Sequence, residues 1–253
     1  NNLSIDGRVV IGEGERDKAP MLYIGEKVGM GGPKVDIALD PLEGTTITAK
    51  GGENALSVLA MAEQGGFLHS PDIYMHKIAY GKKYESLDID PESPSDEIVK
   101  NFAKYSGIKI ENIVVCILDR PRHKELIDKV RSIGARIKLI SDGDVSAVIA
   151  TSFEDSGVDI YMGIGGSPEG VLAAAALRCI GGKIYTKLIF DNDKQIERAK
   201  LMGIIDSKKI YLTNDLASGD VMFSATGVTD GTLLKGVLIK NEVATTQSVV
   251  MRS

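Results

Sequence analysis

Residues 35–45 read VDIALDPLEGT, an apolar run followed directly by a turn with two carboxylates. The run VDIAL is typical of a buried strand, and Pro41 and Gly44 are typical turn residues. A turn does not need Asp40 and Glu43 beside the end of a buried strand, where desolvation makes a charge costly. The stretch therefore predicts a core strand whose end holds a ligand, and the acids indicate a cation.

A second acidic strand end lies earlier in the chain. Glu13, Glu15 and Asp17 follow the strand-like run RVVIG. Two adjacent acidic strand ends repel each other unless a cation lies between them. Oxygen ligands indicate Mg²⁺ or Mn²⁺ rather than zinc, and the three histidines are scattered along the chain. A divalent pair beside the hydroxyl of Thr45 fits phosphoryl hydrolysis, in which metal ions polarise phosphate and activate water.

Composition excludes several other classes of protein. The 253 residues predict one large domain or two modest ones, and 43% hydrophobic with 26% charged residues is ordinary for a soluble globular chain. A net charge of −5 argues against a nucleic-acid partner. No apolar run approaches the length of a membrane span, so we expect no membrane partner. Cys116 and Cys179 lie in apolar runs without metal-ligand spacing, which is typical of free thiols in a reducing cytosol.

The chain changes character near residue 90, where the segment DIDPESPSD indicates a linker. Residues 1–90 read as strands and turns, and runs 55–62 and 72–81 flank a Gly-rich turn that predicts antiparallel partners. Residues 91–207 alternate strands with helices, which predicts a parallel sheet covered on both faces. Residues 208–253 return to strands and are expected to complete the first part. The predicted helices cover 95–106, 121–133, 144–152 and 168–180.

Three successive strands of the second part end in polar loops. DRPRH (119–123) follows VVCIL, DGD (142–144) follows RIKLIS, and IGGSPEG (164–170) follows VDIYMG. Ligands of open α/β sheets bind outside the carboxyl ends of the strands. Each loop alone is equally well explained as solvated turn chemistry, but three loops at one sheet edge favour a shared site.

Two features of these loops have more than one interpretation. Arg120 and Arg122 suit a phosphate through paired donors, whereas the alternative is a solvated helix start. A helix N-terminus prefers acids, so two arginines there need another reason. Glu169, in the first turn of a predicted helix, is either a favourable helix charge or a metal ligand.

The motifs together resemble a known family. DPLEGT resembles the signature of the lithium-sensitive, metal-dependent sugar and inositol phosphatases. The longer stretch VVIGEGERDKAPMLYIGEKVG is more specific, and so are the motifs PDIYMHK, RPRH, DGDV, GIGGSPEG, FSATGVTDG and ATT. With them the sequence is similar to the class II fructose-1,6-bisphosphatases of bacteria, over essentially the whole chain.

This resemblance implies a layered αβαβα sandwich with an α+β first half. It implies hydrolysis of the 1-phosphate of fructose 1,6-bisphosphate in gluconeogenesis, with Mn²⁺ or Mg²⁺, by a cytoplasmic homo-oligomer, either a dimer or a tetramer. The implied metal ligands are Glu13, Asp40, Glu43 and Glu169, and the implied catalytic residues are Thr45 and Asp17. The implied substrate contacts are Glu43, Gly44, Thr45, Tyr74, Arg120, Pro121, Arg122, Asp142, Gly143, Asp144 and Gly166.

The sequence also departs from the family pattern. The family carries an N-terminal segment with a Gly-Arg-Gly-Asp-Lys motif and a further acidic ligand, and a C-terminal tail, none of which this sequence contains. Arg120 stands where some members have lysine. The alternative functions are a phosphatase for inositol monophosphate or sedoheptulose bisphosphate, and a non-catalytic sugar-phosphate sensor. The two arginines favour a bisphosphate, and the intact set of acids argues against a sensor.

Overall fold

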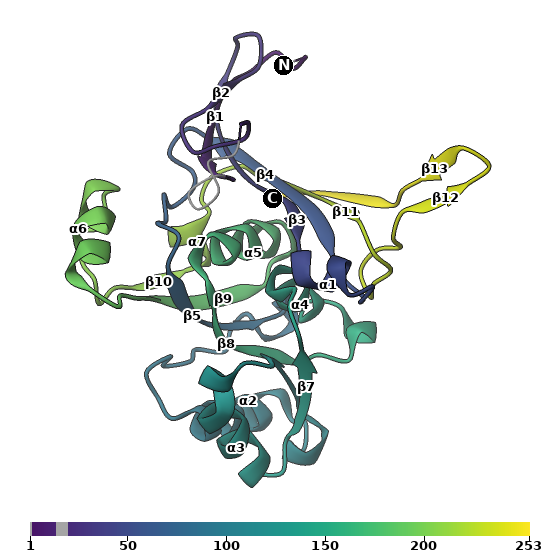
Figure 1. The fold of residues 1–253 in the computed structure, drawn as a ribbon. Helices are drawn as coiled ribbons and strands as arrows, with labels where there is room; N and C mark the ends of the chain where they lie inside the picture. Colours follow the sequence, from purple (N-terminus) through teal and green to yellow (C-terminus); the bar gives the residue numbers. More distant parts are fainter. Residues whose placement is uncertain (1, 14–19) are drawn as a thin grey trace.

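The computed structural model describes residues 2–13 and 20–253. These residues form two six-stranded sheets and one two-stranded sheet. Helices lie between the large sheets and on the outer face of one of them, so that the layers run sheet, helices, sheet, helices (Figure 1). The expected layered α/β sandwich is therefore confirmed.

The first sheet joins the two ends of the chain. Its strand order is β14-β11-β4-β3-β1-β2, and all neighbours are antiparallel except the parallel pair β1–β3. The C-terminal strands β11 and β14 thus extend a sheet begun by the N-terminal strands. The strands are β1 (Asp6–Ile11), β2 (Lys27–Val28), β3 (Lys34–Glu43), β4 (Leu56–Glu63), β11 (Val221–Gly227) and β14 (Ser248–Arg252).

The second sheet has the order β10-β9-β5-β8-β6-β7. β6 is parallel to both β7 and β8, which confirms the parallel prediction for these three strands. β9, the fourth strand within residues 91–207, is antiparallel to β5, and β5 is also antiparallel to β8, so the complete sheet is mixed. The parallel part corresponds to the three strands that carry the polar loops. The strands are β5 (Tyr74–Tyr80), β6 (Val114–Leu118), β7 (Arg136–Ile140), β8 (Ile160–Gly166), β9 (Lys183–Ile189) and β10 (Ile210–Leu212).

Strands β4 and β5 are not partners, contrary to the sequence-based expectation. β4 pairs with β3 and β11 in the first sheet, whereas β5 lies at the centre of the second. Their burial explains the separation, because β4 alternates between buried and accessible residues while β5 is almost continuously buried. Continuous burial is typical of a strand covered on both faces. Sheet membership therefore changes between β4 and β5, and the domain boundary near residue 90 stays a prediction.

Two helices form the layer between the sheets. α4 (Asp144–Ala150) and α5 (Ser167–Ile180) confirm two predicted helices, and α5 contacts strands of both sheets (Figure 1). α5 is apolar on nearly every side, as expected of a helix buried in a core. Its run of alanines lets the two sheets approach it closely. The loops that precede α4 and α5 are thereby held on rigid supports.

Of the remaining helices, two lie on the outer face of the second sheet and one packs against α5. α2 (Ser95–Ser106) and α3 (Lys124–Ser132) cover the outer face of the second sheet and confirm two predicted helices, although the turn Pro121–His123 before α3 is a short 3₁₀-helix. α6 (Asp193–Leu201) was not predicted from the sequence, and a strand was expected where α7 (Thr213–Leu216) follows β10. The short α1 (Thr45–Ala49) follows β3 directly.

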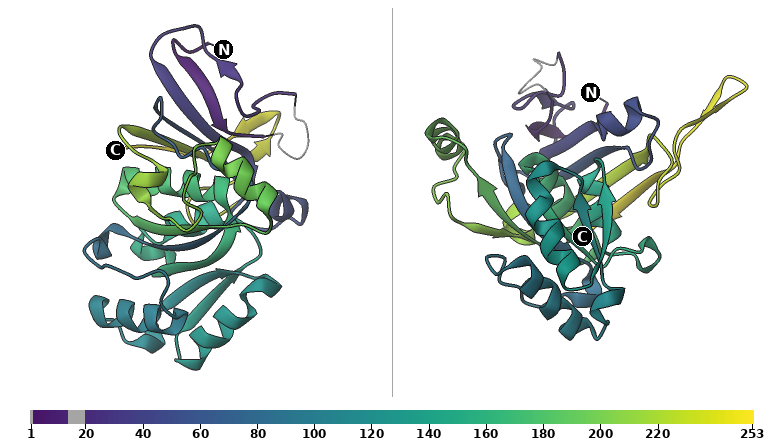
Figure 2. Two further views of the ribbon diagram at one scale, coloured as in Figure 1. Left: turned by 90° about the vertical axis from the view of Figure 1, so that its left-hand side faces the viewer. Right: turned by 60° about the horizontal axis from the view of Figure 1, so that its bottom comes forward.

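A hairpin of β12 (Leu238–Lys240) and β13 (Val243–Thr245) projects from the body of the molecule (Figure 2). Within the described residues, no helix has both the length and the apolar character that crossing a membrane requires.

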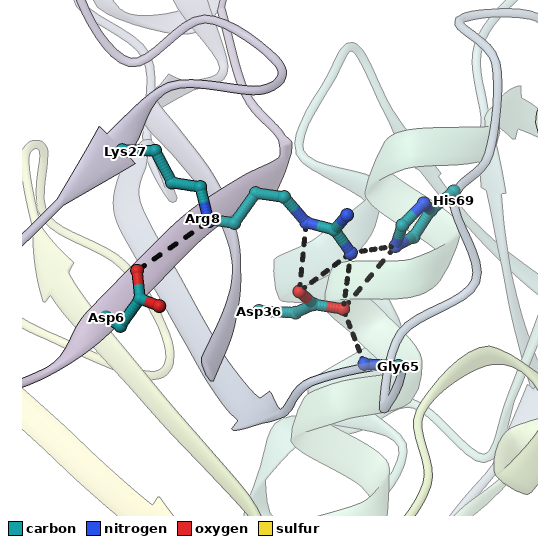
Figure 3. A network of polar contacts seen from close by, with 6 residues as sticks. All are labelled: Asp6, Arg8, Lys27, Asp36, Gly65 and His69. Carbon is teal, nitrogen blue, oxygen red and sulfur yellow. Dashed lines mark hydrogen bonds and ion pairs between the residues drawn. The ribbon is translucent and has the colours of Figure 1, made fainter. Parts of the chain in front are cut away.

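A buried ion pair ties the first sheet to the loop after β4 (Figure 3). Asp36, fully buried on β3, accepts hydrogen bonds from Arg8 on β1, at 3.1 Å from Nη2, and from the backbone N–H of Gly65, at 2.7 Å. His69 Nε2 lies 3.4 Å from the second Asp36 oxygen. A buried carboxylate is costly unless such partners satisfy it, so this network is structural.

Candidate active site

Six carboxylates from both halves of the chain meet between the sheets. We call them the acidic cluster, and all six line one cavity of about 560 Å³. Two end β3, one follows β1, two precede or begin α4, and one lies in the first turn of α5. The members are Glu13, Asp40, Glu43, Asp142, Asp144 and Glu169. The cluster contains the four acids named as candidate metal ligands.

An irregularity in β3 places two of these acids together. In a regular strand, residues three apart point to opposite faces of the sheet. The register of β3 against β4 shifts between Asp40 and Glu43, a bulge that includes Pro41. The Asp40 carboxylate also accepts the N–H of Leu42 at 2.9 Å, which fixes the turn. The proline and the bulge therefore bring both acids to the same cavity.

Glycines allow the other acids to approach closely. Gly143 precedes α4 with φ +85°, a conformation that disfavours other residues, and this turn places Asp144 at the start of the helix. A Cβ on Gly166 would lie 2.0 Å from Glu169 Oε2, so only glycine leaves space for the Glu169 carboxylate. The glycines of the DGD and IGGSPEG loops are thus required by the position of the acids.

The cluster is electrostatically unsatisfied. Burial, together with Glu13, Asp142 and Asp144, raises the pKa of Asp40 to about 6, against the opposing hydrogen bond from Leu42. Burial and the neighbouring acids likewise raise the pKa of Glu43 well above its usual value. The pKa of Glu169 rises to about 7, first because of burial and then because of Asp144.

Two buried oxygens of the cluster have no hydrogen-bond partner among the described residues, Glu43 Oε2 and Glu169 Oε2. Buried polar atoms are normally satisfied, so each of these two requires an explanation. A bound divalent cation supplies one, because it binds carboxylate oxygens and removes the charge repulsion. Among the described residues, no three His, Cys, Asp or Glu side chains are close enough together to hold an ion as they stand. The carboxylate oxygens thus suit a divalent cation, and its set of ligands would be completed only when it binds.

Thr45 is the first residue of α1 and lines the same cavity. The residue that caps this helix is Gly44, with φ 92°, and its cap involves no side-chain hydrogen bond. The alternative role of Thr45 as a helix cap therefore finds no support in the geometry. Thr45 is exposed and lines the acidic cavity, so its side chain is accessible to a ligand bound there.

A second group of candidate residues adjoins the cluster. Arg122 donates from Nε and Nη2 to the carbonyl of Ile164 at 3.0 and 2.7 Å, and its guanidinium lies 4.7 Å from the ring centre of Tyr74. Arg120 Nη2 lies 3.9 Å from Asp142, which links this group to the acidic cluster. Tyr74 and Gly166 line a neighbouring cavity of about 350 Å³ that also includes Glu13, Asp40 and Glu169.

The sequence matches one protein family along its whole length. The model of "Bacterial fructose-1,6-bisphosphatase, glpX-encoded" matches residues 1–253. The chain belongs to this family. It is 44% identical to the D-fructose 1,6-bisphosphatase class 2/sedoheptulose 1,7-bisphosphatase of Prochlorococcus marinus, over 98% of this chain and 79% of that protein. It is 42% identical to the protein of the same name from Trichodesmium erythraeum, over 100% of this chain and 81% of that protein.

The structure of this glpX-family chain places most of the candidate residues near one another. Glu43, Gly44, Thr45, Asp142 and Asp144 line the acidic cavity, and Gly143 lies between the last two. Pro121 and Arg122 line a shallow surface beside α3 instead of either cavity, although Arg122 contacts Tyr74. Asp17 and Glu15 lie outside the described residues.

Sequence reasoning missed two residues that support this site. His123, buried, lies 2.7 Å from the Leu118 carbonyl through Nδ1 and accepts the N–H of Ile164 at 2.7 Å through Nε2. It therefore holds the same residue, Ile164, whose carbonyl accepts the hydrogen bonds of Arg122. Lys77 on β5 pairs with Asp144 at 2.6 Å inside the core. A lysine within the apolar run YMHKIAY was the available signal, because lysine is almost never fully buried without a partner.

Proposed function

We propose that this protein is a phosphoric monoester hydrolase that removes the 1-phosphate of fructose 1,6-bisphosphate, giving fructose 6-phosphate and inorganic phosphate. The observation that carries the proposal is the buried acidic cluster with two unpartnered carboxylate oxygens, beside a pair of arginines. Membership of the glpX family gives this arrangement its substrate class.

Glu13, Asp40, Glu43 and Glu169 would hold the divalent cations. When bound, Mg²⁺ or Mn²⁺ polarises the phosphoryl group and lowers the pKa of the attacking water. The chain's own contribution is to keep four carboxylates in one cavity despite their repulsion. Hard oxygen donors suit either ion, and which one the protein prefers is decided by titration with each.

Thr45 orients the attacking water. Thr45 begins α1 directly after the bulged strand that carries Asp40 and Glu43, and it lines the same cavity as these two acids. Asp17, predicted to assist catalysis, is proposed in this role on the family resemblance alone. A positioned hydrogen-bonding group of this kind contributes about 10²–10⁴-fold in rate.

Arg120 and Arg122 bind the second phosphate. An arginine carries five N–H donors, and the Ile164 carbonyl occupies only Nε and Nη2 of Arg122. This bond and the Tyr74 ring orient the guanidinium before substrate arrives. Asp142 and Asp144 line the acidic cavity, and their carboxylates can accept hydrogen bonds from the hydroxyls of the sugar.

Sedoheptulose 1,7-bisphosphate is the second candidate substrate. The names of the relatives from Prochlorococcus and Trichodesmium both include this activity. Both substrates have a phosphate at each end, so the arginine pair serves either one. The proposed assembly as a cytoplasmic homo-oligomer remains a prediction from the family resemblance.

The test is release of inorganic phosphate from a panel of three substrates: the two sugar bisphosphates and inositol monophosphate. Each is assayed with Mn²⁺, with Mg²⁺ and with a chelator. We expect hydrolysis of one or both bisphosphates, only with a metal ion, and little release from inositol monophosphate. Undiminished activity in the chelator, or a preference for the monophosphate, would contradict the proposal.

A further inference from the structure

Lys77 is a buried cation on the inner side of the acidic cluster. Its side chain is 1% exposed, and Nζ lies 2.6 Å from Asp144 Oδ2. It lies at the centre of β5, which is an interior strand of the second sheet. An ammonium group is expensive to bury, and a paired carboxylate offsets that cost.

The packing around this ammonium group depends on two glycines. A Cβ on Gly165, in β8, would lie 3.1 Å from Lys77 Nζ and 2.1 Å from Asp144 Oδ2. A Cβ on Gly170, in α5, would lie 3.3 Å from Lys77 Cε. The strand and the helix therefore both leave space for the ion pair. Such a specific cradle indicates that the lysine is held in one position.

Lys77 and the cavity contact Asp144 from different sides. Asp144 lines the acidic cavity, whereas Lys77 is not among the described residues that line it. The charge of Lys77 also extends to Glu169, where it lowers the pKa against the larger raising effects of burial and Asp144. The lysine therefore places a cationic side chain beside Asp144, one of the six acids of the cluster.

We propose that Lys77 is a positioning residue that serves as the fixed cation of the acidic cluster. It pairs with Oδ2 of Asp144 and so prevents this acid from acting as a metal ligand. The other carboxylate oxygen of Asp144 stays available for substrate. The exchangeable divalent cations are thereby confined to Asp40, Glu43 and Glu169, with Glu13. This inference rests on the proposed function, because it assumes that the cluster binds divalent cations.

The experiment measures Mn²⁺ binding directly, by titration calorimetry at pH 8 without substrate. Lys77→Met keeps the length and apolar stem of the side chain but removes its charge. Asp144 is then an uncompensated acid beside the metal ligands, and we expect Mn²⁺ to bind at least about tenfold more tightly, or with an additional equivalent. In Lys77→Met/Asp144→Asn, which removes both charges, we expect the affinity to return to within about threefold of the wild type.

The matched control is Arg8→Met, which removes the cation from the other buried ion pair. It should lower the thermal unfolding midpoint without changing Mn²⁺ affinity, since Asp36 does not line the acidic cavity. A purely structural role for Lys77 predicts the same pattern for Lys77→Met. An unchanged Mn²⁺ affinity in folded Lys77→Met would therefore overturn the proposal.

Asp144→Asn alone provides a second arm if Lys77→Met does not fold. This variant leaves the ammonium group without its anion, so the unbalanced positive charge should weaken Mn²⁺ binding by about tenfold. Unchanged binding would overturn the proposal. Phosphate release by the wild type is measured in parallel. If the wild type hydrolyses no bisphosphate while the binding pattern holds, the proposed function fails and the role of Lys77 stands.

Discussion

Asp36 and Glu43 lie on the same strand and are both buried, yet their surroundings are opposite. Asp36 accepts hydrogen bonds from Arg8 and from the backbone of Gly65, with His69 beside it (Figure 3). Glu43 accepts one bond, from the N–H of Val145 at 3.3 Å, and otherwise faces other acids. The protein itself compensates the first charge. The second is left for a ligand, and this difference separates a structural acid from a functional one.

The largest expected effect is loss of turnover in Glu43→Gln. Removing one anionic ligand weakens the cation's stabilisation of transition-state charge, which is worth several kcal/mol, so kcat should fall by about 10²–10⁴-fold. Because the glutamate is buried among like charges, the metal-free variant should melt no earlier than the wild type. The measurements are phosphate release and a thermal melt in chelator. A strongly lowered thermal unfolding midpoint would show that Glu43, like Asp36, is a structural acid.

Thr45→Ala should have an effect on turnover that is nearly as large. If the hydroxyl positions the attacking water, kcat should fall by about 10²–10⁴-fold while the fold and Mn²⁺ binding persist. Thr45→Ser keeps the hydroxyl and should retain part of the activity. A variant that turns over normally but melts earlier would show that Thr45 only supports α1, where a cap is worth about 1 kcal/mol.

Asp36→Asn should give the opposite result to Glu43→Gln. It removes the anion from a compensated pair and should lower the free energy of unfolding by roughly 3 kcal/mol, the lower end for breaking a buried pair. The lower end applies because the Arg8 side chain is still 33% exposed. Denaturant unfolding measures the loss, and kcat of the folded fraction should stay close to the wild-type value. A large fall in kcat would remove the distinction between the two acids.

The sequence predicted the acids of the site better than the sheets that hold them. Each acid in the candidate set ends a strand or begins a helix, and such positions can be recognised from local patterns alone. Strand β5 was misplaced because a Gly-rich turn suggests a hairpin, whereas its pairing with β8 and β9 depends on distant residues. Lys77 was overlooked for the same reason. Its partner Asp144 is far away in sequence, and only the fold brings the two charges together.

The bulge between Asp40 and Glu43 could not be predicted from the periodicity of the sequence either. Regular alternation places residues three apart on opposite faces, so the shared cavity follows only from the register against β4. The bond between Arg122 and the Ile164 carbonyl also needs tertiary structure, because it joins the RPRH loop to the IGGSPEG loop.

Arg122 is an intermediate case between the two acids, and Arg122→Ala should change KM while leaving kcat nearly unchanged. The Ile164 carbonyl and the Tyr74 ring partly compensate its charge, and N–H donors remain for a ligand. If those donors bind the distal phosphate equally in the ground state and the transition state, KM should rise while kcat stays nearly constant. Loss of a hydrogen bond to a charged group costs about 1.5–3 kcal/mol, or about 10- to 150-fold in KM.

Steady-state kinetics of Arg122→Ala on fructose 1,6-bisphosphate measures kcat and KM separately. Tyr74→Phe is the matched control, since it keeps the ring beneath the guanidinium and should change KM less. A collapse of kcat at saturating substrate would instead show that Arg122 acts on the reacting phosphate, together with the cation ligands.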